Sequence, residues 1–196
     1  MLWRLRPSDT DIELHTYTRQ MCIDLEERTG QASWSENGGL FVACTAERMA
    51  EYERLGETGR YFGIESSVLS PAETKALHPL LAVDDVYGSL YSPTDGTIDP
   101  SGVVTQYSKA ARALGARVFE GVSLESLETA EVSPGVRRVT AAVAAGGHKI
   151  RTPVVINAAG AWGGAVAAMA GAELPLRALK HAFVVTEAIE GMQASP

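Results

Sequence analysis

A segment of small residues, Asn157-Ala158-Ala159-Gly160, is the part of this sequence best suited to holding a ligand. Small side chains and a glycine let a ligand approach the main chain closely and reach its N–H groups. Where such a turn leads into a helix, the helix N-terminus also favours anionic groups. The expected chemistry is therefore non-covalent binding of an anionic ligand. The alternative is that the small residues only allow a strand and a helix to pack closely, as in any α/β protein.

The segments on either side of this turn predict a strand–turn–helix unit. Val154-Val155-Ile156 is a run of β-branched residues, which is typical of a strand buried on both faces of a parallel sheet. Residues 161–170 predict a helix, because apolar residues recur there at helical spacing and a glycine, Gly171, follows. In open α/β sheets, ligands bind at the carboxyl ends of such strands.

Few other arrangements of residues have catalytic potential. The histidines are scattered, without a carboxylate or cysteine at metal-ligand spacing, so we expect no metal site. They are His15, His78, His148 and His181. No G-x-S-x-G sequence is present to anchor a hydrolase triad, and neither G-x-x-x-x-G-K nor G-x-G-x-x-G occurs.

The composition is that of a soluble globular protein. Of the 196 residues, 45% are hydrophobic and 21% are charged, and the net charge is −7. The acidic balance argues against nonspecific nucleic-acid binding and against a basic membrane-binding surface. No apolar run approaches the roughly 18 residues of a membrane span. Cys22 and Cys44 are expected to be free thiols in a reducing compartment.

Four further helices are predicted from apolar spacing and from capping residues. Their expected ranges are about 9–29, 46–62, 71–78 and 101–114. The third has a strong start signal, because Ser70 precedes a proline and Glu73 completes a capping box. The fourth begins at Asp99-Pro100, where the aspartate is expected to cap the helix.

Strands and hairpins are predicted between these helices. Asn37-Gly38-Gly39 predicts a hairpin turn within residues 33–45, and Gly146-Gly147 predicts another within residues 136–152. Further strands are expected at residues 65–69, 86–91, 118–120, 123–128 and 183–186. This order predicts a mixed α/β (α+β) fold, in which a partial Rossmann-like half is interleaved with an antiparallel-sheet half.

Several charged residues outside the turn are expected to have ordinary structural roles. Arg4 and Arg6 precede the first helix and are expected to be solvated. Asp95 and Asp99 lie four residues apart in a loop, which is not a catalytic geometry, so turn and capping roles are expected for both.

Six blocks of the sequence, in order, resemble the sarcosine dehydrogenase and dimethylglycine dehydrogenase branch of the D-amino-acid-oxidase-like FAD-dependent oxidoreductases. The blocks are LWRLRPSDTDIEL, ENGGLFVA, YFGIESSVLSPAETKALHPLL, DVYGSLYSPTDGTIDPSGV, ALGARVFEGV and VVINAAGAW…MAG…LPL…KHAFVVTE. One block alone would be a weak match. Six blocks in register over nearly the whole chain identify it as a member of that family.

The resemblance implies an FAD enzyme that oxidises an N-methyl amino acid, a secondary amine such as sarcosine, by hydride transfer to the flavin. It implies a helix of the FAD-binding part at 1–30, a substrate-domain part at 31–98, a Rossmann-like FAD-binding part at 99–172 and a return to the substrate sheet at 173–196. Electron-transfer flavoprotein and tetrahydrofolate are the implied partners. The implied location is the mitochondrial matrix in a eukaryote and the cytoplasm otherwise. A dimethylglycine dehydrogenase, and a non-catalytic relative such as the pyruvate dehydrogenase phosphatase regulatory subunit, stay as alternatives.

The resemblance also implies roles for individual residues. The implied FAD contacts are Leu124 on the adenine side and Ala159, Gly160 and Trp162 beside the pyrophosphate and ribose. His181 matches a catalytic histidine on the substrate side, and its alternative is a strand histidine that faces solvent. Arg177 and Lys180 are candidates to bind a substrate carboxylate, although solvated surface charges are the favoured interpretation of both.

The match has gaps that limit what the chain is expected to do alone. The family's glycine-rich phosphate loop has no counterpart in these 196 residues, and the histidine that carries the flavin in this branch would fall just before Leu2. The resemblance therefore predicts an internal portion of a larger enzyme, inactive on its own.

Overall fold

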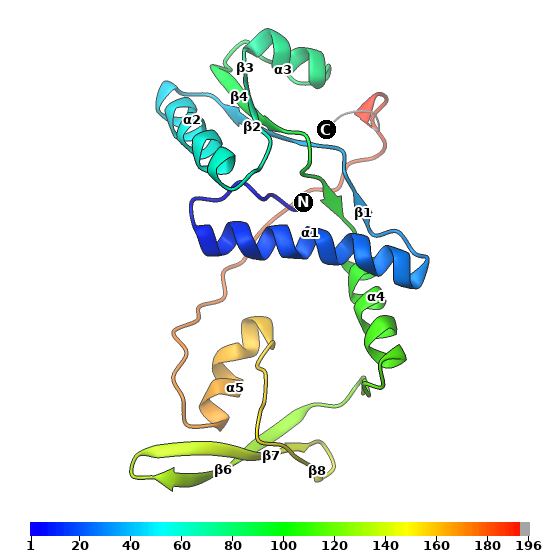
Figure 1. Ribbon diagram of the computed structural model, residues 1–196, viewed down its shortest axis with the longest axis vertical. Coiled ribbons are helices and arrows are strands. Elements are labelled where there is room, and N and C mark those ends of the chain that lie inside the picture. Colours follow the sequence, from blue (N-terminus) through cyan, green and yellow to red (C-terminus); the bar gives the residue numbers. More distant parts are fainter. Residues whose placement is uncertain (193–196) are drawn as a thin grey trace. The chain divides into compact units, whose positions relative to one another are not determined.

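The computed structural model describes residues 1–192 and divides them into two compact units. The first unit comprises Met1–Arg117 and the described residues from Thr186, and the second comprises Val118–Val185. Each unit is a mixture of helices and antiparallel strands, as Figure 1 shows. The predicted mixed α+β fold is therefore confirmed, and every pairing between strands in the described residues is antiparallel.

The helices of the first unit begin and end within one residue of the predicted bounds. They are α1 (Asp9–Thr29), α2 (Ala46–Tyr61), α3 (Pro71–Leu77) and α4 (Pro100–Ala113). Ser70 caps α3 in a complete capping box, since its hydroxyl accepts from the Glu73 N–H and the Glu73 carboxylate accepts from the Ser70 N–H at 2.8 Å. Gly30 ends α1 with a φ of 69°, a left-handed conformation that favours glycine.

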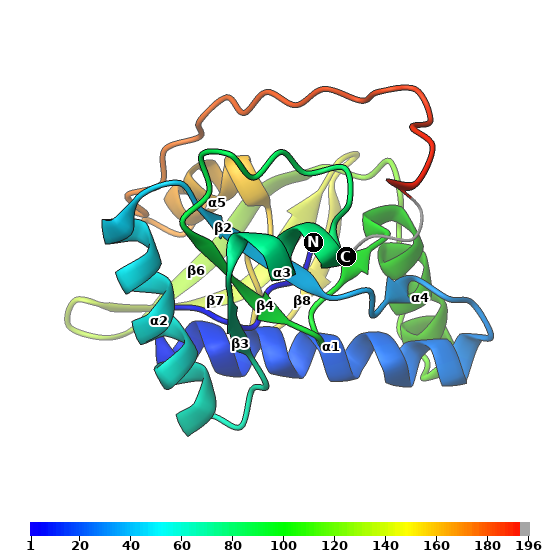
Figure 2. The ribbon, with the colours of Figure 1, turned by 90° about the horizontal axis from the view of Figure 1, so that it is seen from above.

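A three-stranded antiparallel sheet in the order β2-β4-β3 forms the centre of the first unit. Its strands are β2 (Gly39–Ala43), β3 (Ser67–Leu69) and β4 (Gly88–Ser92). Leu90 faces α2, since a Cβ on Gly56 would lie 3.2 Å from its Cδ1. Ser89 faces α3, since its hydroxyl lies 2.7 Å from that of Thr74. Because neighbouring residues of a strand point to opposite faces, α2 and α3 cover opposite faces of this sheet (Figure 1, Figure 2).

The hydrophobic core of the first unit lies on the α2 side of this sheet. Its buried members are Leu5, Ile12, Ile64 and Leu90, and Phe41, Tyr52, Leu55 and Phe62 pack around them. They come from the N-terminal segment, α1, α2 and the sheet, so the core joins elements that are far apart in the sequence. The helix pair α1 and α4 adds a second contact, fixed in part by the Lys109 ammonium, which donates to the Thr29 carbonyl at 2.9 Å.

The hairpin predicted at Asn37-Gly38-Gly39 is wrong. The two strands on either side of it, β1 (Trp34–Ser35) and β2, do not pair with each other. β1 pairs with β5 (Thr97–Ile98), and β2 pairs with β4. The Gly38 N–H donates to the carbonyl of Asp95 at 2.9 Å instead of closing a local turn. Long-range pairing with residues 88–98 has replaced the local turn that the glycines favour.

The second unit contains a three-stranded meander and a short helix. Its strands β6 (Leu124–Ser133), β7 (Val136–Ala144) and β8 (His148–Arg151) pair in sequence order, with three register shifts between β6 and β7. The predicted hairpin with its turn at Gly146-Gly147 is therefore confirmed. A 3-10 turn, η1 (Gly160–Trp162), leads into α5 (Gly163–Met169), which packs against β6. Residues 118–120, predicted as a strand, have no strand structure.

Two further strand predictions in the second half of the chain are also wrong. Neither Val154–Ile156 nor residues 183–186 form a strand. Both runs are exposed instead: Ile156 retains 87% of its exposure and Val184 retains 88%. A strand requires a hydrogen-bonding neighbour, and no described segment pairs with either run. High β propensity alone does not form a strand.

Candidate functional site

The side chain of Asn157 fixes the conformation of the small-residue turn in the second unit. The Asn157 amide donates to the carbonyl of Gly163 at 2.8 Å, and its amide oxygen accepts from the Ala159 N–H at 3.2 Å. This local bonding is typical of asparagine in turns. Gly160 has a φ of 53°, and no other atom lies within 4 Å of the position where its Cβ would be. The main chain at Gly160 is therefore accessible to a ligand.

The residues predicted to contact FAD all lie in this second unit. Ala159 and Gly160 form the turn, and Trp162 follows on η1 with 75% of its side chain exposed. Leu124 is the first residue of β6, the strand against which α5 packs, and is half-buried. The structure thus joins Ala159, Gly160 and Trp162 in one turn and places Leu124 on the neighbouring strand.

The residues predicted on the substrate side are not brought together into a site. Arg177, Lys180 and His181 lie in an irregular segment, and all three are exposed. The strand that was expected to carry His181 toward a substrate is absent from the structure, as described above.

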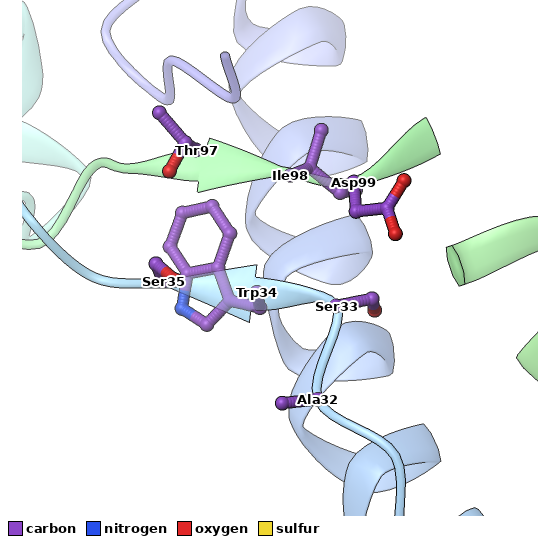
Figure 3. Close-up of a pocket in the computed structure, with 7 residues that line it drawn as sticks. All are labelled: Ala32, Ser33, Trp34, Ser35, Thr97, Ile98 and Asp99. Atoms are coloured by element: carbon purple, nitrogen blue, oxygen red, sulfur yellow. The ribbon is translucent and has the colours of Figure 1, made fainter. Parts of the chain in front are cut away.

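A pocket of about 320 Å³ lies in the first unit, beside the two-stranded ribbon of β1 and β5. Figure 3 shows its lining residues: Ala32, Ser33, Trp34, Ser35, Thr97, Ile98 and Asp99. Trp34 pairs with Ile98 and Ser35 pairs with Thr97 across the ribbon. The lining residues carry an indole ring, hydroxyl groups and one carboxylate, and in Figure 3 the Trp34 ring and the Asp99 carboxylate extend in opposite directions along the ribbon.

Hydrogen bonds fix Asp99, which is itself exposed, at one end of this pocket. The Asp99 N–H donates to the Ser33 carbonyl at 2.8 Å, and its carboxylate accepts from the Ser101 N–H at 3.0 Å, so that Asp99 caps α4 as predicted. The Ser33 hydroxyl donates to the side chain of Gln106, which is fully buried and donates in turn to the carbonyl of Gln31. These contacts hold the pocket wall against α4 and against the segment that follows α1.

A buried ion pair lies close to the other end of the ribbon. The Arg4 guanidinium Nε is 3.6 Å from the Asp95 carboxylate, and Asp95 has no exposed surface. The Arg4 N–H donates to the same carboxylate at 3.2 Å, and the Arg4 side chain also donates to Thr94. The expectation that Arg4 is solvated is therefore wrong, and the side chain of Asp95 does more than form a turn. Arg6 is also not freely solvated, since its guanidinium carbon lies 5.4 Å from the centre of the Trp3 ring.

Burial shifts the pKa values of both members of this pair toward their neutral forms. Desolvation raises the pKa of Asp95, although the Arg4 main-chain and side-chain groups oppose the shift. Desolvation also lowers the pKa of Arg4. Among the described residues, Arg4 Nε, Ser92 Oγ and Asp95 Oδ2 are buried polar atoms without a hydrogen-bond partner. The sequence carries no local signal for this pair, because only tertiary packing buries Arg4.

Two absences concern the described residues alone. Within residues 1–192, no group of three or more histidine, cysteine, aspartate or glutamate side chains is placed to hold a metal ion. In the same range, none of the helices has the length and apolar character required to cross a bilayer.

Comparison of the sequence with known proteins assigns the chain to a family. The model of the family described as "FAD dependent oxidoreductase" (DAO) matches residues 2–196. The mitochondrial sarcosine dehydrogenase of Mus musculus is 52% identical over the full chain, which spans 21% of that protein. The mitochondrial dimethylglycine dehydrogenase of Rattus norvegicus is 30% identical over 93% of this chain and 21% of its own length.

The fold also resembles that of a solved structure. The L-proline dehydrogenase of P. horikoshii superimposes with a TM-score of 0.79 at 24% identity, over 87% of this chain and 44% of that structure. At this identity the likeness concerns the fold. The match of residues 2–196 to the family model shows that the chain belongs to the FAD-dependent oxidoreductases of the DAO family.

Proposed function

We propose that the protein, at its full encoded length, is an FAD-dependent dehydrogenase that oxidises an N-methyl amino acid such as sarcosine. The observation that carries this proposal is the 52% identity to a sarcosine dehydrogenase along the whole chain, against 30% to a dimethylglycine dehydrogenase. Both names describe N-methylated derivatives of glycine. The shared substrate chemistry is therefore a methylated amine that carries a carboxylate.

The residues of the small-residue turn fit one side of an FAD molecule. Gly160 is exposed and has open space where a Cβ would lie, and Leu124 offers a half-buried apolar surface on β6. Main-chain groups and an apolar side chain suit an adenine or a ribose. When bound, FAD supplies the acceptor for the hydride equivalent. The glycine-rich loop that holds the pyrophosphate in related folds does not occur in this sequence.

The remaining roles are proposed on the same basis. Trp162 would border the FAD turn, Arg177 and Lys180 would bind the substrate carboxylate, and His181 would accept a hydrogen bond from the substrate amine. The segments 1–30 and 99–172 would belong to the FAD-binding part, and the segments 31–98 and 173–196 to the substrate part. Because Arg177, Lys180 and His181 are exposed here, these roles require neighbouring residues from outside the described chain.

The relatives also support proposals for location and partners. Both dehydrogenases named above are mitochondrial, which supports the mitochondrial matrix for a eukaryotic source and the cytoplasm otherwise. Electron-transfer flavoprotein as the electron acceptor and tetrahydrofolate as the one-carbon acceptor are proposed partners of the full-length enzyme.

A non-catalytic role is the second candidate. The pyruvate dehydrogenase phosphatase regulatory subunit of Mus musculus is 28% identical over 61% of this chain. A regulatory protein of this type would act by binding a partner. The lower identity and shorter match make the dehydrogenase the better-supported function.

Reduction of the bound flavin by amines tests the proposed function. The full-length protein is mixed anaerobically with sarcosine, dimethylglycine or proline, and flavin absorbance is followed. Bleaching by sarcosine at the highest kcat/KM supports the proposal. A flavin that no amine reduces would favour the regulatory role. His181→Asn is expected to slow reduction while bound FAD stays nearly unchanged, because a histidine near the amine would act in proton transfer.

The 196-residue chain alone is expected to bind FAD weakly or not at all and to be inactive. Main-chain contacts at Ala159 and Gly160 offer few charge-assisted hydrogen bonds to a pyrophosphate. Calorimetry with excess FAD measures this directly. Tight stoichiometric binding would show that a glycine-rich loop is dispensable.

A further inference from the structure

We propose that Asn37 is a site of spontaneous deamidation, and that the hydrogen bond from the Gly38 N–H to the Asp95 carbonyl controls the rate of this modification. The reaction consumes only water, so it is independent of the amine oxidation proposed above. The inference is carried by the dipeptide Asn37-Gly38, by the exposure of the asparagine and by the bond that holds the glycine amide to a distant residue.

Deamidation begins when the main-chain nitrogen that follows an asparagine attacks the carbonyl carbon of its side chain. At Asn37 the Gly38 nitrogen loses its proton to hydroxide and bonds to Cγ, and the side-chain nitrogen takes up a proton and leaves as ammonia. The product is a cyclic succinimide. A water molecule then opens the ring on either side, which gives aspartate or isoaspartate. A following glycine favours the attack, because it has no side chain to obstruct it and its main chain is conformationally free.

Asn37 is the more reactive of the two asparagines in the chain. It is exposed, and within residues 1–192 no hydrogen bond holds its side-chain amide. Asn157, by contrast, is followed by an alanine. Its amide donates to the Gly163 carbonyl at 2.8 Å, and its amide oxygen accepts from the Ala159 N–H at 3.2 Å. Ring closure at Asn157 would break both bonds, so this residue is an internal reference for slow reaction.

The attacking nitrogen of Gly38 is held by a hydrogen bond in the folded chain. The Gly38 N–H donates to the Asp95 carbonyl at 2.9 Å, and Gly38 is buried although Asn37 beside it is exposed. An amide must lose such a bond before hydroxide can remove its proton and before its nitrogen can attack. Opening would also leave the Asp95 carbonyl without this partner, and buried main-chain groups are almost always paired. The reaction therefore proceeds only from a locally open state.

Long-range contacts on both sides keep Asp95 in place. Its carboxylate accepts from the Arg4 N–H at 3.2 Å and lies 3.6 Å from the Arg4 Nε. On the β2 side, a Cβ at Gly39 would lie 3.3 Å from the Asp95 Cβ, so the aspartate packs directly on the strand. The next residue, Gly96, forms a two-way bridge with Leu2, with N···O distances of 2.9 and 3.4 Å. Opening of the Gly38–Asp95 bond therefore reports separation of these segments.

The modification would make a transient opening permanent. In isoaspartate the main chain runs through Cβ and Cγ, which adds an atom between the Cα of residue 37 and the Gly38 nitrogen. Gly38 then cannot keep its bond to Asp95 while Gly39 keeps its register opposite Ser92 on β4. Both products also place a new carboxylate beside Glu36, which already pairs with Arg19. Deamidation is therefore expected to loosen the start of β2.

Comparison with an unfolded peptide tests the site. The full-length protein and a synthetic peptide of residues 33–42 are incubated at neutral pH, and digestion with mass spectrometry measures aspartate and isoaspartate at position 37 over time. Asn37 in the protein is expected to react at least about tenfold more slowly than in the peptide, because only the open state reacts. It is expected to react faster than Asn157. Asn37→Gln, whose longer side chain closes this ring poorly, is the control for the assignment.

Amide hydrogen exchange of Gly38 provides an independent measure of the same opening. Exchange also begins with removal of the Gly38 proton by hydroxide, so it requires the same open state as deamidation. We therefore expect both processes at this position to be slowed by the same factor relative to the peptide. Overlapping fragments that differ by Gly38 give its exchange rate in the full-length protein.

Two substitutions of Asp95 test the control exerted by its contacts. Asp95→Ala leaves the Arg4 guanidinium unpaired, and it is expected to speed both deamidation at Asn37 and exchange at Gly38 about tenfold, since loss of one partner of a buried pair destabilises its surroundings. Asp95→Asn removes the same charge but keeps an acceptor for the Arg4 N–H, so it is expected to change both rates less. Deamidation at Asn157 is expected to stay unchanged in both variants.

The possible contrary results overturn separate parts of the inference. If Asn37 stays unmodified while the Gly38 amide exchanges fully and the peptide reacts, Asn37 is not a deamidation site. A rate equal to that of the peptide, or a rate that Asp95→Ala leaves unchanged, rejects control by the Gly38–Asp95 bond. If Asp95→Ala does not fold, Gly39→Ala crowds the Asp95 side chain instead, and a rate unchanged relative to a peptide with the same substitution rejects that control.

Discussion

The two units differ in how many apolar residues each buries with its own described residues. The first buries nine apolar residues, from the N-terminal segment, α1, the central sheet and the loops that flank it. In residues 118–185, all of which the structure describes, Ala141 is the single buried apolar residue. Both units contain strand-forming sequence, but in the second unit the strongest runs are exposed. The difference shows that apolar patterning predicts a strand only where the chain also supplies the neighbour that pairs with it.

Truncation of an apolar side chain should change the free energy of unfolding far more in the first unit than in the second. Leu90→Ala is expected to lower the free energy of unfolding by about 2–5 kcal/mol, because Leu90 is 1% exposed in the core. Ile156→Ala in the second unit is expected to change it by less than about 0.5 kcal/mol, since Ile156 is 87% exposed. Denaturant unfolding followed by tryptophan fluorescence measures both. A large loss for Ile156→Ala would mean that a neighbour covers this run in solution.

Two helical glycines should respond to alanine with opposite signs. A Cβ at Gly59 in α2 would collide with the core residue Leu5, so Gly59→Ala is expected to destabilise by about 1–3 kcal/mol. A Cβ at Gly164 in α5 has only an ordinary contact, 3.7 Å from the Leu174 carbonyl oxygen. Gly164→Ala is therefore expected to stabilise by up to about 1 kcal/mol through helix propensity. Thermal unfolding of the two variants tests the contrast, and equal signs would contradict it.

Loss of a helix cap should have a smaller effect. Ser70→Ala removes the hydroxyl that accepts from the Glu73 N–H, and it is expected to cost about 1 kcal/mol. Ser70→Thr keeps a hydroxyl and serves as the control. Amide exchange at the first turn of α3 reports the loss locally. If Ser70→Ala exchanges as slowly as Ser70→Thr, the capping box does not stabilise this helix.

The pH dependence should show the smallest effect. Because burial raises the pKa of Asp95, the folded state holds this proton more tightly than the unfolded state. Stability from this group is therefore present below the unfolded pKa and is lost as pH rises through the higher folded pKa. The thermal midpoint of wild type relative to Asp95→Asn is expected to fall as pH rises from 3 to 7. A relative midpoint that rises over this range would show that Arg4 dominates the environment of Asp95.

Local signals predicted the helices well, whereas long-range pairing was predicted poorly. Ser70 and Asp99 act as caps in the positions expected, because capping involves only the next few residues. The hairpin at residues 37–39 failed, because its two strands pair with residues 88–98 instead. A local turn signal did not decide the strand pairing here. The strand that pairs with β2 lies roughly fifty residues further along the chain, and the entropy cost of closing a loop grows only slowly with its length.

The candidate sites show the same contrast between local signals, which the sequence reveals, and long-range contacts, which it does not. The open turn at Ala159 and Gly160 was predictable, since small residues and a glycine act within one segment. The pocket beside β1 and β5 was not predictable, because it forms only when these two strands pair. Arg4 was predicted to be solvated, as its position before a helix suggests, and its burial depends on residues more than ninety positions away.

Asp99 ends the β1–β5 ribbon and also caps α4, so one residue joins a pair of strands to a helix. Its N–H donates to the Ser33 carbonyl beside β1, and its carboxylate accepts from the Ser101 N–H at the positive end of the helix dipole. Fraying of the first turn of α4 would release the carboxylate and loosen the ribbon, and loss of the ribbon would loosen the cap. Order in the ribbon and order in the first turn of α4 are therefore linked by a single coupling free energy, equal in both directions. A probe of helix order placed in α4 would report a disturbance of the ribbon at a distance.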